Sequence, residues 1–347
     1  MLVRYAALHP VPALMMIFAA ISMAISQYSC SDTVHTVTFR RTMCHRNDAK
    51  LRQVKHPMAM QCHSYVHRGH GGMWMPTLGF GTGGSTSGDL QKRRDGVTAA
   101  LAADVRHIDT AQNYRDEAVV ADAIRASGVP RQSVWITSKW QPPYSHAHAF
   151  NATVEALRLS LARMKLDYLN EFLLHTPCSV DRLDQWRGLL YARDELKLVR
   201  SVGVSNYEIR HLEDLRLAGL EMPAVNQMQL HPWMTRDADV AYAAAHGIVI
   251  EAWKPLGLVS KWSDPVVTRI AKAHAQPIGA VMLRWSVQRG IVPIFGTDSP
   301  AHLQADLRVY AAGFKLSDDE MTAISGLNQN LSAPGYEEQM KWSQSCP

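Results

Sequence analysis

The chain is poor in cysteine and in charge, and its sequence contains no long run of purely apolar residues. Five cysteines among 347 residues exclude a small scaffold built from disulfides. Charged side chains make up 19% of the chain and hydrophobic ones 47%, so the chain can bury a sizeable core and is not globally disordered. A chain of this length is expected to contain one large domain with an appendage.

The net charge of +5 is concentrated at one end of the chain. Residues 1–72 hold eight basic and two acidic side chains, whereas the remaining residues hold 28 basic and 29 acidic ones. The basic character therefore belongs to the leading segment, and the body is almost neutral. Nucleic-acid binding, which needs a basic face on the folded domain, loses its support.

Residues 1–63 are predicted to be a targeting segment that is disordered or cleaved. Arg4 supplies a basic start, residues 13–25 are apolar with one exception, and Ala24 and Ser26 offer small side chains at a cleavage site. Together these features predict a signal peptide, with the protein entering the secretory route or an organelle.

Two alternatives for this segment stay open. The apolar run is shorter than the roughly 20 residues of a membrane-spanning helix. Residues 5–26 nevertheless carry no charge, so an uncleaved anchor is an alternative. Translation could also begin at Met58 or Met60, and the protein would then be cytoplasmic. No membrane contact is expected for the body itself.

From residue 64 to residue 330, short apolar runs alternate with longer amphipathic ones. The predicted strands are Thr77–Thr82, His107–Thr110, Val134–Ser138, Asn170–His175, Val199–Val204, Ala224–Leu230, Ile248–Trp253 and Ile291–Phe295. The predicted helices include Glu117–Ser127, Ala152–Met164, Asp237–His246 and Ser299–Ala311, the last with Ser299 as its cap and Pro300 at its first position. Eight such alternations predict an α/β fold, a parallel eight-stranded (β/α)8 TIM barrel. Residues 331–347 are predicted to be a polar C-terminal tail.

The start of the body has its own pattern. Residues 65–75, with three glycines in the middle, predict a short N-terminal β-hairpin before the first barrel strand. An open doubly wound sheet is the rival fold. However, residues 79–83 lack the G-x-G-x-x-G spacing that such a sheet uses for a dinucleotide, and they precede no convincing helix.

Polar residues stand at or after the carboxyl ends of several predicted strands, where barrel enzymes keep their active groups. A phenol has a pKa of about 10, so Tyr114 needs help to exchange a proton at neutral pH. Lys139 could lower that pKa, and Asp109 could hold the ammonium group in place. His175 could donate a hydrogen bond to a carbonyl oxygen. These groups can protonate a developing alkoxide, and because no side chain supplies hydride, a nicotinamide cofactor is implied.

Four further polar or aromatic residues suit that cofactor. Ser205, Asn206 and Gln227 offer hydrogen-bond donors and acceptors for a carboxamide, and Trp253 offers a flat face for stacking on a ring. Each of these residues also has an ordinary structural explanation when it is taken alone, so the prediction depends on their combination.

Six segments of the body resemble those of the aldo-keto reductases and occur in the same order. They are Met75–Thr82, Arg106–Glu117, Leu173–His175, Gly203–Asn206, Pro223–Gln227 and Pro255–Gly257. The resemblance covers residues 64–330 and implies NAD(P)H-dependent reduction of aldehydes and ketones to alcohols by a monomer without a metal. It implies a catalytic tetrad of Asp109, Tyr114, Lys139 and His175, with Tyr114 as the acid in reduction and the base in oxidation.

The resemblance also implies a set of cofactor-binding residues. They are Gly81, Thr82, Asp109, Ser205, Asn206, Gln227, Trp253, Pro255, Leu256, Gly296, Thr297, His302 and Asp306. Many relatives that prefer NADP carry lysine where Gly296 stands, often arginine at His302 and asparagine at Asp306. NADPH is the expected cofactor, and NADH stays open because of these departures.

The expected substrate is a small-molecule carbonyl compound. Relatives often carry tryptophan where Gly83 and Thr176 stand, so we predict an open pocket that accepts bulkier or more polar carbonyl compounds.

Two alternative functions stay open. One is a lyase that uses Lys139 as a Schiff base, and the other is a reductase-like barrel that acts as a cofactor-binding sensor or a structural subunit.

Overall fold

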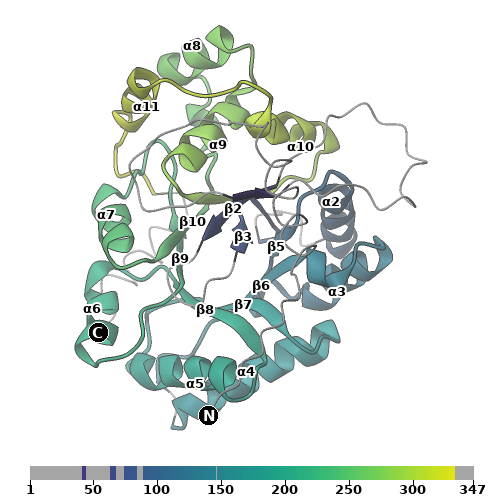
Figure 1. Ribbon diagram of the computed structural model, residues 1–347, viewed down its shortest axis with the longest axis vertical. Coiled ribbons are helices and arrows are strands. Elements are labelled where there is room, and N and C mark those ends of the chain that lie inside the picture. Colours follow the sequence, from purple (N-terminus) through teal and green to yellow (C-terminus); the bar gives the residue numbers. More distant parts are fainter. Residues whose placement is uncertain (1–40, 44–62, 68–73, 84–88, 146, 333–347) are drawn as a thin grey trace, which may run out of the picture. The chain divides into compact units, whose positions relative to one another are not determined.

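The computed structural model describes residues 41–43, 63–67, 74–83, 89–145 and 147–332 (Figure 1). Most of the predicted leader, residues 1–63, and most of the predicted tail, residues 331–347, therefore lie outside the described residues. The domain boundaries at residues 63 and 330 stay predictions.

Eight parallel strands close into a barrel, and in Figure 1 they form a ring with the helices outside it. The strands are β4 (Gly79–Gly81), β5 (His107–Asp109), β6 (Trp135–Trp140), β7 (Leu169–Leu174), β8 (Val199–Ser205), β9 (Val225–Gln229), β10 (Val249–Trp253) and β11 (Val292–Phe295). Each strand pairs with the next in the sequence, and β11 pairs with β4 to close the ring. All eight predicted strands are present, with ends that differ by at most two residues. The predicted (β/α)8 barrel is confirmed.

The barrel strands are buried on both faces because one face points inward and the other packs against helices. Every residue of β7 and β9 is buried. A parallel strand in this setting can read as a continuous apolar run, as β11 does. Strands β7 and β9 also contain polar residues, such as Glu171 and Gln227, that are buried inside the barrel.

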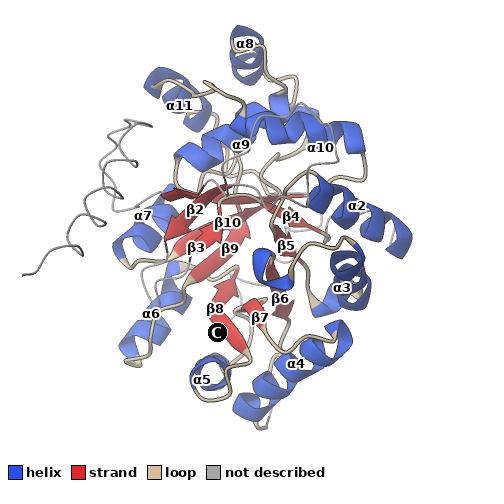
Figure 2. Cartoon of the chain, turned by 45° about the vertical axis from the view of Figure 1, so that its right-hand side comes forward, coloured by secondary structure: helices blue, strands red, loops and turns tan. Residues whose placement is uncertain are grey.

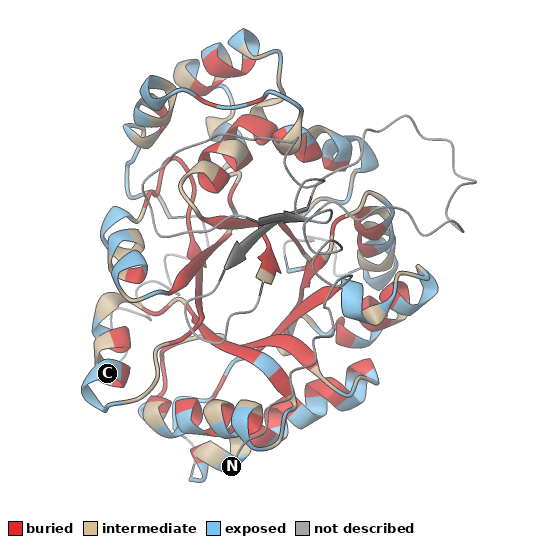
Figure 3. Ribbon diagram, viewed as in Figure 1, coloured by how far each residue is buried: buried red, intermediate tan, exposed pale blue. Residues whose placement is uncertain are grey.

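Helices surround the barrel, with buried inner faces and exposed outer faces (Figures 2 and 3). They are α2 (Leu90–Ala102), α3 (Glu117–Ala126), α4 (Ala149–Met164), α5 (Arg182–Asp194), α6 (Ile209–Leu217), α7 (Asp237–Ala245), α8 (Pro265–Ala273), α9 (Ile278–Gln288), α10 (Pro300–Asp306) and α11 (Asp318–Ser325). Short 3-10 turns are η2 (Gln112–Tyr114), η3 (Arg131–Ser133), η4 (Val259–Lys261) and η5 (Leu307–Tyr310). No helix in the described part of the chain is long and apolar enough to cross a membrane.

The helix predicted over residues 299–311 consists of two pieces, α10 and η5. Its predicted start is confirmed, because the Ser299 side chain accepts a hydrogen bond from the backbone N–H of His302 and Pro300 is the first helical residue. The change from α-helix to 3-10 turn lies at Asp306 and Leu307.

The predicted N-terminal hairpin is also confirmed. Strand β2 (His63–His67) pairs antiparallel with β3 (Trp74–Pro76), with Tyr65 opposite Pro76. Strand β1 (Arg41–Met43) pairs with β2 and makes a third strand that the sequence did not predict. Met75 is fully buried and packs with residues at the amino ends of the barrel strands, such as Trp135 and Val225. The hairpin therefore closes the amino-terminal end of the barrel and leaves the carboxyl end to the site.

One covalent crosslink involves the loop after β7. Cys178 is buried and disulfide-bonded. The other four cysteines, Cys30, Cys44, Cys62 and Cys346, lie outside the described residues.

Candidate functional site

The four residues of the predicted tetrad come together at the carboxyl ends of β5, β6 and β7. Lys139 Nζ donates hydrogen bonds to Asp109 Oδ1 at 2.6 Å and to the backbone oxygen of Thr110 at 3.0 Å. The same ammonium lies 5.1 Å from the centroid of the Tyr114 ring. The rings of Tyr114 and His175 meet edge to face, with their centroids 5.7 Å apart. A phenol, an ammonium and an imidazole thus surround one point at the mouth of the barrel.

Lys139 is a permanent cation in this setting. Burial would lower the pKa of its amine, but the carboxylate of Asp109 and the nearby Tyr114 outweigh burial and raise the pKa to about 12. The side chain is fully buried. A buried cation needs a close anionic partner, and Asp109 provides it.

Tyr114 keeps its proton at neutral pH. Burial raises the pKa of its phenol above the ordinary value, and the positive charge of Lys139 acts in the opposite direction. We expected from the sequence that Lys139 would lower this pKa. Lys139 does so, but burial is the larger effect and the net direction is upward. The phenol is therefore protonated at neutral pH and is a weaker acid than an exposed tyrosine.

His175 is a neutral imidazole. Burial, followed by the charge of Lys139, lowers its pKa to about 3. Its Nδ1 is buried and has no hydrogen-bond partner within the described part of the chain. The backbone N–H of His175 donates to the carbonyl of Trp140, which fixes the start of the loop after β7. A neutral ring with an unsatisfied nitrogen is suited to hydrogen-bond a ligand oxygen.

The predicted carboxamide-binding residues lie at the end of β8, in the middle of β9 and at the end of β10, and Asn206 among them contacts His175. Asn206 Nδ2 donates to the backbone oxygen of His175 at 3.1 Å, and Asn206 Oδ1 accepts from Trp253 Nε1 at 3.0 Å. Ser205 Oγ donates to the backbone oxygen of Gln227 at 2.9 Å. Asn206 has a φ of +63°, a left-handed conformation that asparagine tolerates better than most residues. These hydrogen bonds hold the four residues as one polar cluster.

Four other predicted cofactor residues line a small cavity of about 60 Å³ near the ends of β4 and β11. They are Gly81, Thr82, Gly296 and Thr297. A Cβ atom on Gly296 would lie 2.5 Å from the backbone oxygen of Gly81, so the structure has no space for a side chain there. The lysine that many relatives carry at this position is therefore incompatible with this packing.

The remaining predicted cofactor residues lie in α10 or in the loop after β10. Asp306 is buried, and burial raises its pKa to about 7. A Cβ atom on Gly279 would touch both the Asp306 carboxylate and the Leu256 side chain, so these two residues are neighbours. Pro255 is buried, whereas His302 is exposed on α10. The structure thus separates the predicted cofactor residues into three groups along the barrel mouth.

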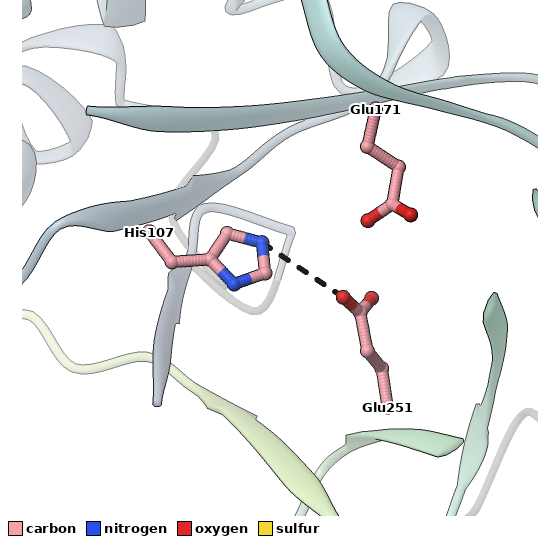
Figure 4. Close-up of side chains that lie close together, drawn as sticks. All are labelled: His107, Glu171 and Glu251. Carbon is pink, nitrogen blue, oxygen red and sulfur yellow. Dashed lines mark ion pairs between the residues drawn. The ribbon is translucent and has the colours of Figure 1, made fainter. Parts of the chain in front are cut away.

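The sequence analysis missed three ionisable side chains inside the barrel. They are His107 on β5, Glu171 on β7 and Glu251 on β10, all with no exposed surface (Figure 4). One side-chain nitrogen or oxygen atom from each of the three lies within 4.8 Å of the other two. An acidic residue in the middle of an apolar strand was the available signal, but we considered only the ends of the strands.

Comparison with known proteins gives a consistent result. A family model described as the aldo/keto reductase family matches residues 77–329. An aldo-keto reductase of Mycolicibacterium vanbaalenii is 40% identical over 257 residues, covering 74% of this chain and 89% of the relative. A glyoxal reductase of Bacillus subtilis is 34% identical, covering 75% of this chain and 92% of the relative.

A solved structure is similar as well. The crystal structure of a Bombyx mori aldo-keto reductase in complex with NADP is 28% identical and has a TM-score of 0.72. The match covers 79% of this chain and 96% of that chain.

Proposed function

The chain belongs to the aldo/keto reductase family and is an NAD(P)H-dependent carbonyl reductase, and on that premise we propose that Asp109, Tyr114, Lys139 and His175 are its catalytic residues. The observation that carries this proposal is the position of the Lys139 ammonium, 2.6 Å from Asp109 and 5.1 Å from the centroid of the Tyr114 ring.

The roles of the four residues follow from their charges. When bound, the nicotinamide cofactor supplies hydride to the carbonyl carbon. The neutral imidazole of His175 hydrogen-bonds the carbonyl oxygen and polarises it. Tyr114 holds the proton that this oxygen receives, and the ammonium of Lys139 stabilises the phenolate that remains. Asp109 keeps Lys139 charged and in place.

The residues that are present fit a nicotinamide cofactor. The indole of Trp253 is held by its hydrogen bond to Asn206, and it supplies an aromatic ring of the kind that stacks on a nicotinamide. Ser205, Asn206 and Gln227 provide the polar groups for a carboxamide. Thr82 Oγ1 is buried without a partner among the described residues, as expected of an atom that faces a ligand.

We propose NADPH as the preferred form, with NADH as a second cofactor to be tested. The complex of the Bombyx mori relative with NADP supports NADPH. Gly296, which leaves no space for a lysine, argues for a weaker preference than in relatives that carry one. Titration of the protein with each nucleotide checks this, and equal affinity for both would contradict the proposed preference.

Replacement of Tyr114 by phenylalanine tests the proposed function. We expect kcat for 4-nitrobenzaldehyde with NADPH to fall about 10²- to 10⁴-fold, since the proton donor is lost. The dissociation constant of NADPH is expected to stay nearly unchanged. Tyr207→Phe is the matched control, because the Tyr207 hydroxyl is buried without a hydrogen-bond partner in the described part. Full turnover by Tyr114→Phe would show that another group donates the proton.

For the substrate, we propose carbonyl compounds that are bulkier or more polar than small aldehydes. Gly83 is exposed and Thr176 is half-buried, so neither provides a large apolar wall beside Tyr114. Measurement of kcat/KM over a panel of aldehydes and ketones checks this. A strong preference for small hydrophobic aldehydes would overturn it.

The raised pKa of Lys139 argues against a Schiff-base lyase, which needs a neutral amine as its nucleophile. Failure to trap a substrate adduct on Lys139 with borohydride is the expected result. A sensor or structural subunit would bind NADPH without turning over any carbonyl compound, so the same kinetic panel separates that alternative.

We further propose that residues 1–63 contain a leader that targets the protein to an oxidising compartment and that the body acts as a monomer. The disulfide at Cys178 supports an oxidising compartment, because such bonds are rare in the cytosol. The mass of the mature protein tests whether a leader is removed, and its size in solution tests the monomer.

A further inference from the structure

Three ionisable side chains meet inside the barrel (Figure 4). His107 Nε2 lies 4.0 Å from Glu251 Oε1, and Glu171 points toward Glu251 from the opposite side. None of the three has exposed surface. Since buried charged groups are costly unless they are hydrogen-bonded, the partners of each carboxylate indicate what it does.

The partner of Glu251 connects it to the tetrad. Gln227 Nε2 donates one hydrogen bond to Glu251 Oε2 at 2.8 Å and another to Asp109 Oδ2 at 2.9 Å. The second oxygen of Asp109 accepts from Lys139 at 2.6 Å. A continuous chain of hydrogen bonds therefore runs from Glu251 through Gln227 and Asp109 to the ammonium, and all four residues are buried.

The chemistry of an amide makes this arrangement selective. An amide nitrogen carries two hydrogens, and in Gln227 both are donated to carboxylates. A rotation of the amide by 180° would turn its oxygen toward two carboxylates, which repel it. The amide of Gln227 is therefore held in one orientation, in which only its oxygen Oε1 is left to contact a ligand. This oxygen can only accept a hydrogen bond.

We propose that Glu251 is a positioning residue of the reductase site, which acts through Gln227 to orient both the Asp109–Lys139 pair and the acceptor oxygen offered to the cofactor's carboxamide. This inference rests on the proposed function. Glu251 itself touches neither the tetrad's proton nor the cofactor. Its effect is to occupy the second hydrogen of the Gln227 amide.

Glu171 provides a matched comparison within the same barrel. It is equally buried and carries the same group, but it accepts a hydrogen bond from Thr137 Oγ1 at 3.1 Å. Thr137 in turn lies 3.0 Å from His107 Nε2. Replacement of Glu171 removes a buried carboxylate without touching the Gln227 amide.

The experiment compares methionine and glutamine at both positions. Methionine has a similar length but no acceptor, whereas glutamine retains an oxygen that can accept the second hydrogen of Gln227. For Glu251→Met we expect the NADPH dissociation constant, measured by tryptophan fluorescence, to rise about tenfold because a buried donor loses its acceptor. We expect kcat to fall at least as much, with a smaller change in KM for the carbonyl substrate.

Glu251→Gln is expected to restore NADPH affinity and kcat to within about threefold of the unsubstituted protein, since the acceptor is retained. For Glu171→Met and Glu171→Gln, NADPH affinity and kcat are expected to stay within about threefold of the values for the unsubstituted protein. Circular dichroism and thermal unfolding confirm that each variant is folded.

The inference is overturned if Glu251→Met binds NADPH normally, if Glu251→Gln is as impaired as Glu251→Met, or if Glu171→Met shows the same loss. The binding measurement needs no turnover. If the unsubstituted protein binds NADPH but reduces no carbonyl compound, the proposed function fails, while the affinities of the variants still decide the role of Glu251.

Discussion

At the scale of single residues, Gly83 leaves the space that the ring of Tyr114 occupies. A Cβ atom on Gly83 would lie 2.5 Å from Cζ and 2.8 Å from the hydroxyl oxygen of Tyr114. Atoms at that distance overlap, so any side chain at position 83 would displace the phenol. The sequence showed that a large wall is absent at Gly83, and the structure adds that the backbone itself contacts the candidate proton donor.

Gly83→Ala is therefore expected to impair the reaction more than the folding. Displacement of a reacting group by about 1 Å can reduce the rate by roughly 10²-fold, so we expect kcat to fall between tenfold and a hundredfold. The melting temperature is expected to change little, because Gly83 is exposed. Steady-state kinetics and thermal unfolding measure the two effects.

Gly326→Ala is the control for this substitution. The new methyl group would meet its nearest neighbours at 3.4 Å and 3.5 Å, which is close to an ordinary contact, and it lies after α11, away from the tetrad. Normal kcat in Gly83→Ala would mean that the loop moves aside and that Gly83 does not shape the site.

At the scale of elements, the strands bring the site residues together, and N-cap residues stabilise the first turns of the surrounding helices. Asp264 begins α8 by accepting a hydrogen bond from the backbone N–H of Val266 at 2.9 Å, and Pro265 occupies the first helical position. Aspartate before proline at a helix start is a pattern that local sequence determines.

Asp264→Ala is expected to lower the free energy of unfolding by about 1 kcal/mol, the usual effect of losing an N-cap. Urea unfolding at neutral pH measures this. Asp184→Ala is the matched control, since Asp184 forms an exposed ion pair with Arg187 on α5 and should contribute less than about 0.5 kcal/mol. Equal losses in both variants would show that the cap adds nothing specific.

Two buried carboxylates, Glu251 and Glu171, lie in the middle of strands and not at their ends, so the polar residues at the strand ends did not reveal them. Glu251 lies in the middle of β10, where its inward direction, and not its distance from the strand end, puts it beside Gln227. Glu171 likewise lies in the middle of its strand, β7, and points into the barrel. A charged residue inside a largely apolar strand is the sequence signal that marks both positions.

At the scale of the whole molecule, stability is linked to pH through buried histidines on separate elements. Burial lowers the pKa of His211 on α6 to about 3 and that of His231, after β9, to about 4. Both are fully buried. The unfolded chain takes up protons near pH 6.5, well above the pKa values in the folded protein.

Because the unfolded state binds more protons below pH 6.5, the free energy of unfolding should fall as the pH falls from 6.5 toward 4. Each histidine contributes up to about 1.4 kcal/mol per pH unit in that range. Asp306, whose pKa is raised to about 7, acts in the opposite direction. The quantity to measure is therefore the pH dependence of the free energy of unfolding in a histidine variant, compared with that of the unsubstituted protein.

Urea unfolding at several pH values between 5 and 7.5 should give a shallower pH dependence for His211→Asn than for the unsubstituted protein. His211 accepts a hydrogen bond from the backbone N–H of Glu208 through Nδ1, and asparagine can supply an acceptor there. Identical slopes would mean that folding does not lower the pKa of His211.

The sequence by itself determined the architecture and pointed to the four residues that we propose as the tetrad. Apolar runs, amphipathic helices and caps are local patterns, so they predicted eight strands within two residues of their ends, and the polar residues at or after the strand ends indicated Asp109, Tyr114, Lys139 and His175. These features need no knowledge of which segments meet in space.

Only the tertiary structure decided how these residues act on one another. Barrel closure brings Gln227 within hydrogen-bond distance of Asp109, 118 residues earlier, and of Glu251, 24 residues later. It also sets the net direction of the Tyr114 pKa, since burial outweighs the charge of Lys139. Contacts across the barrel and the exclusion of water depend on distances between distant segments, and no local pattern records them.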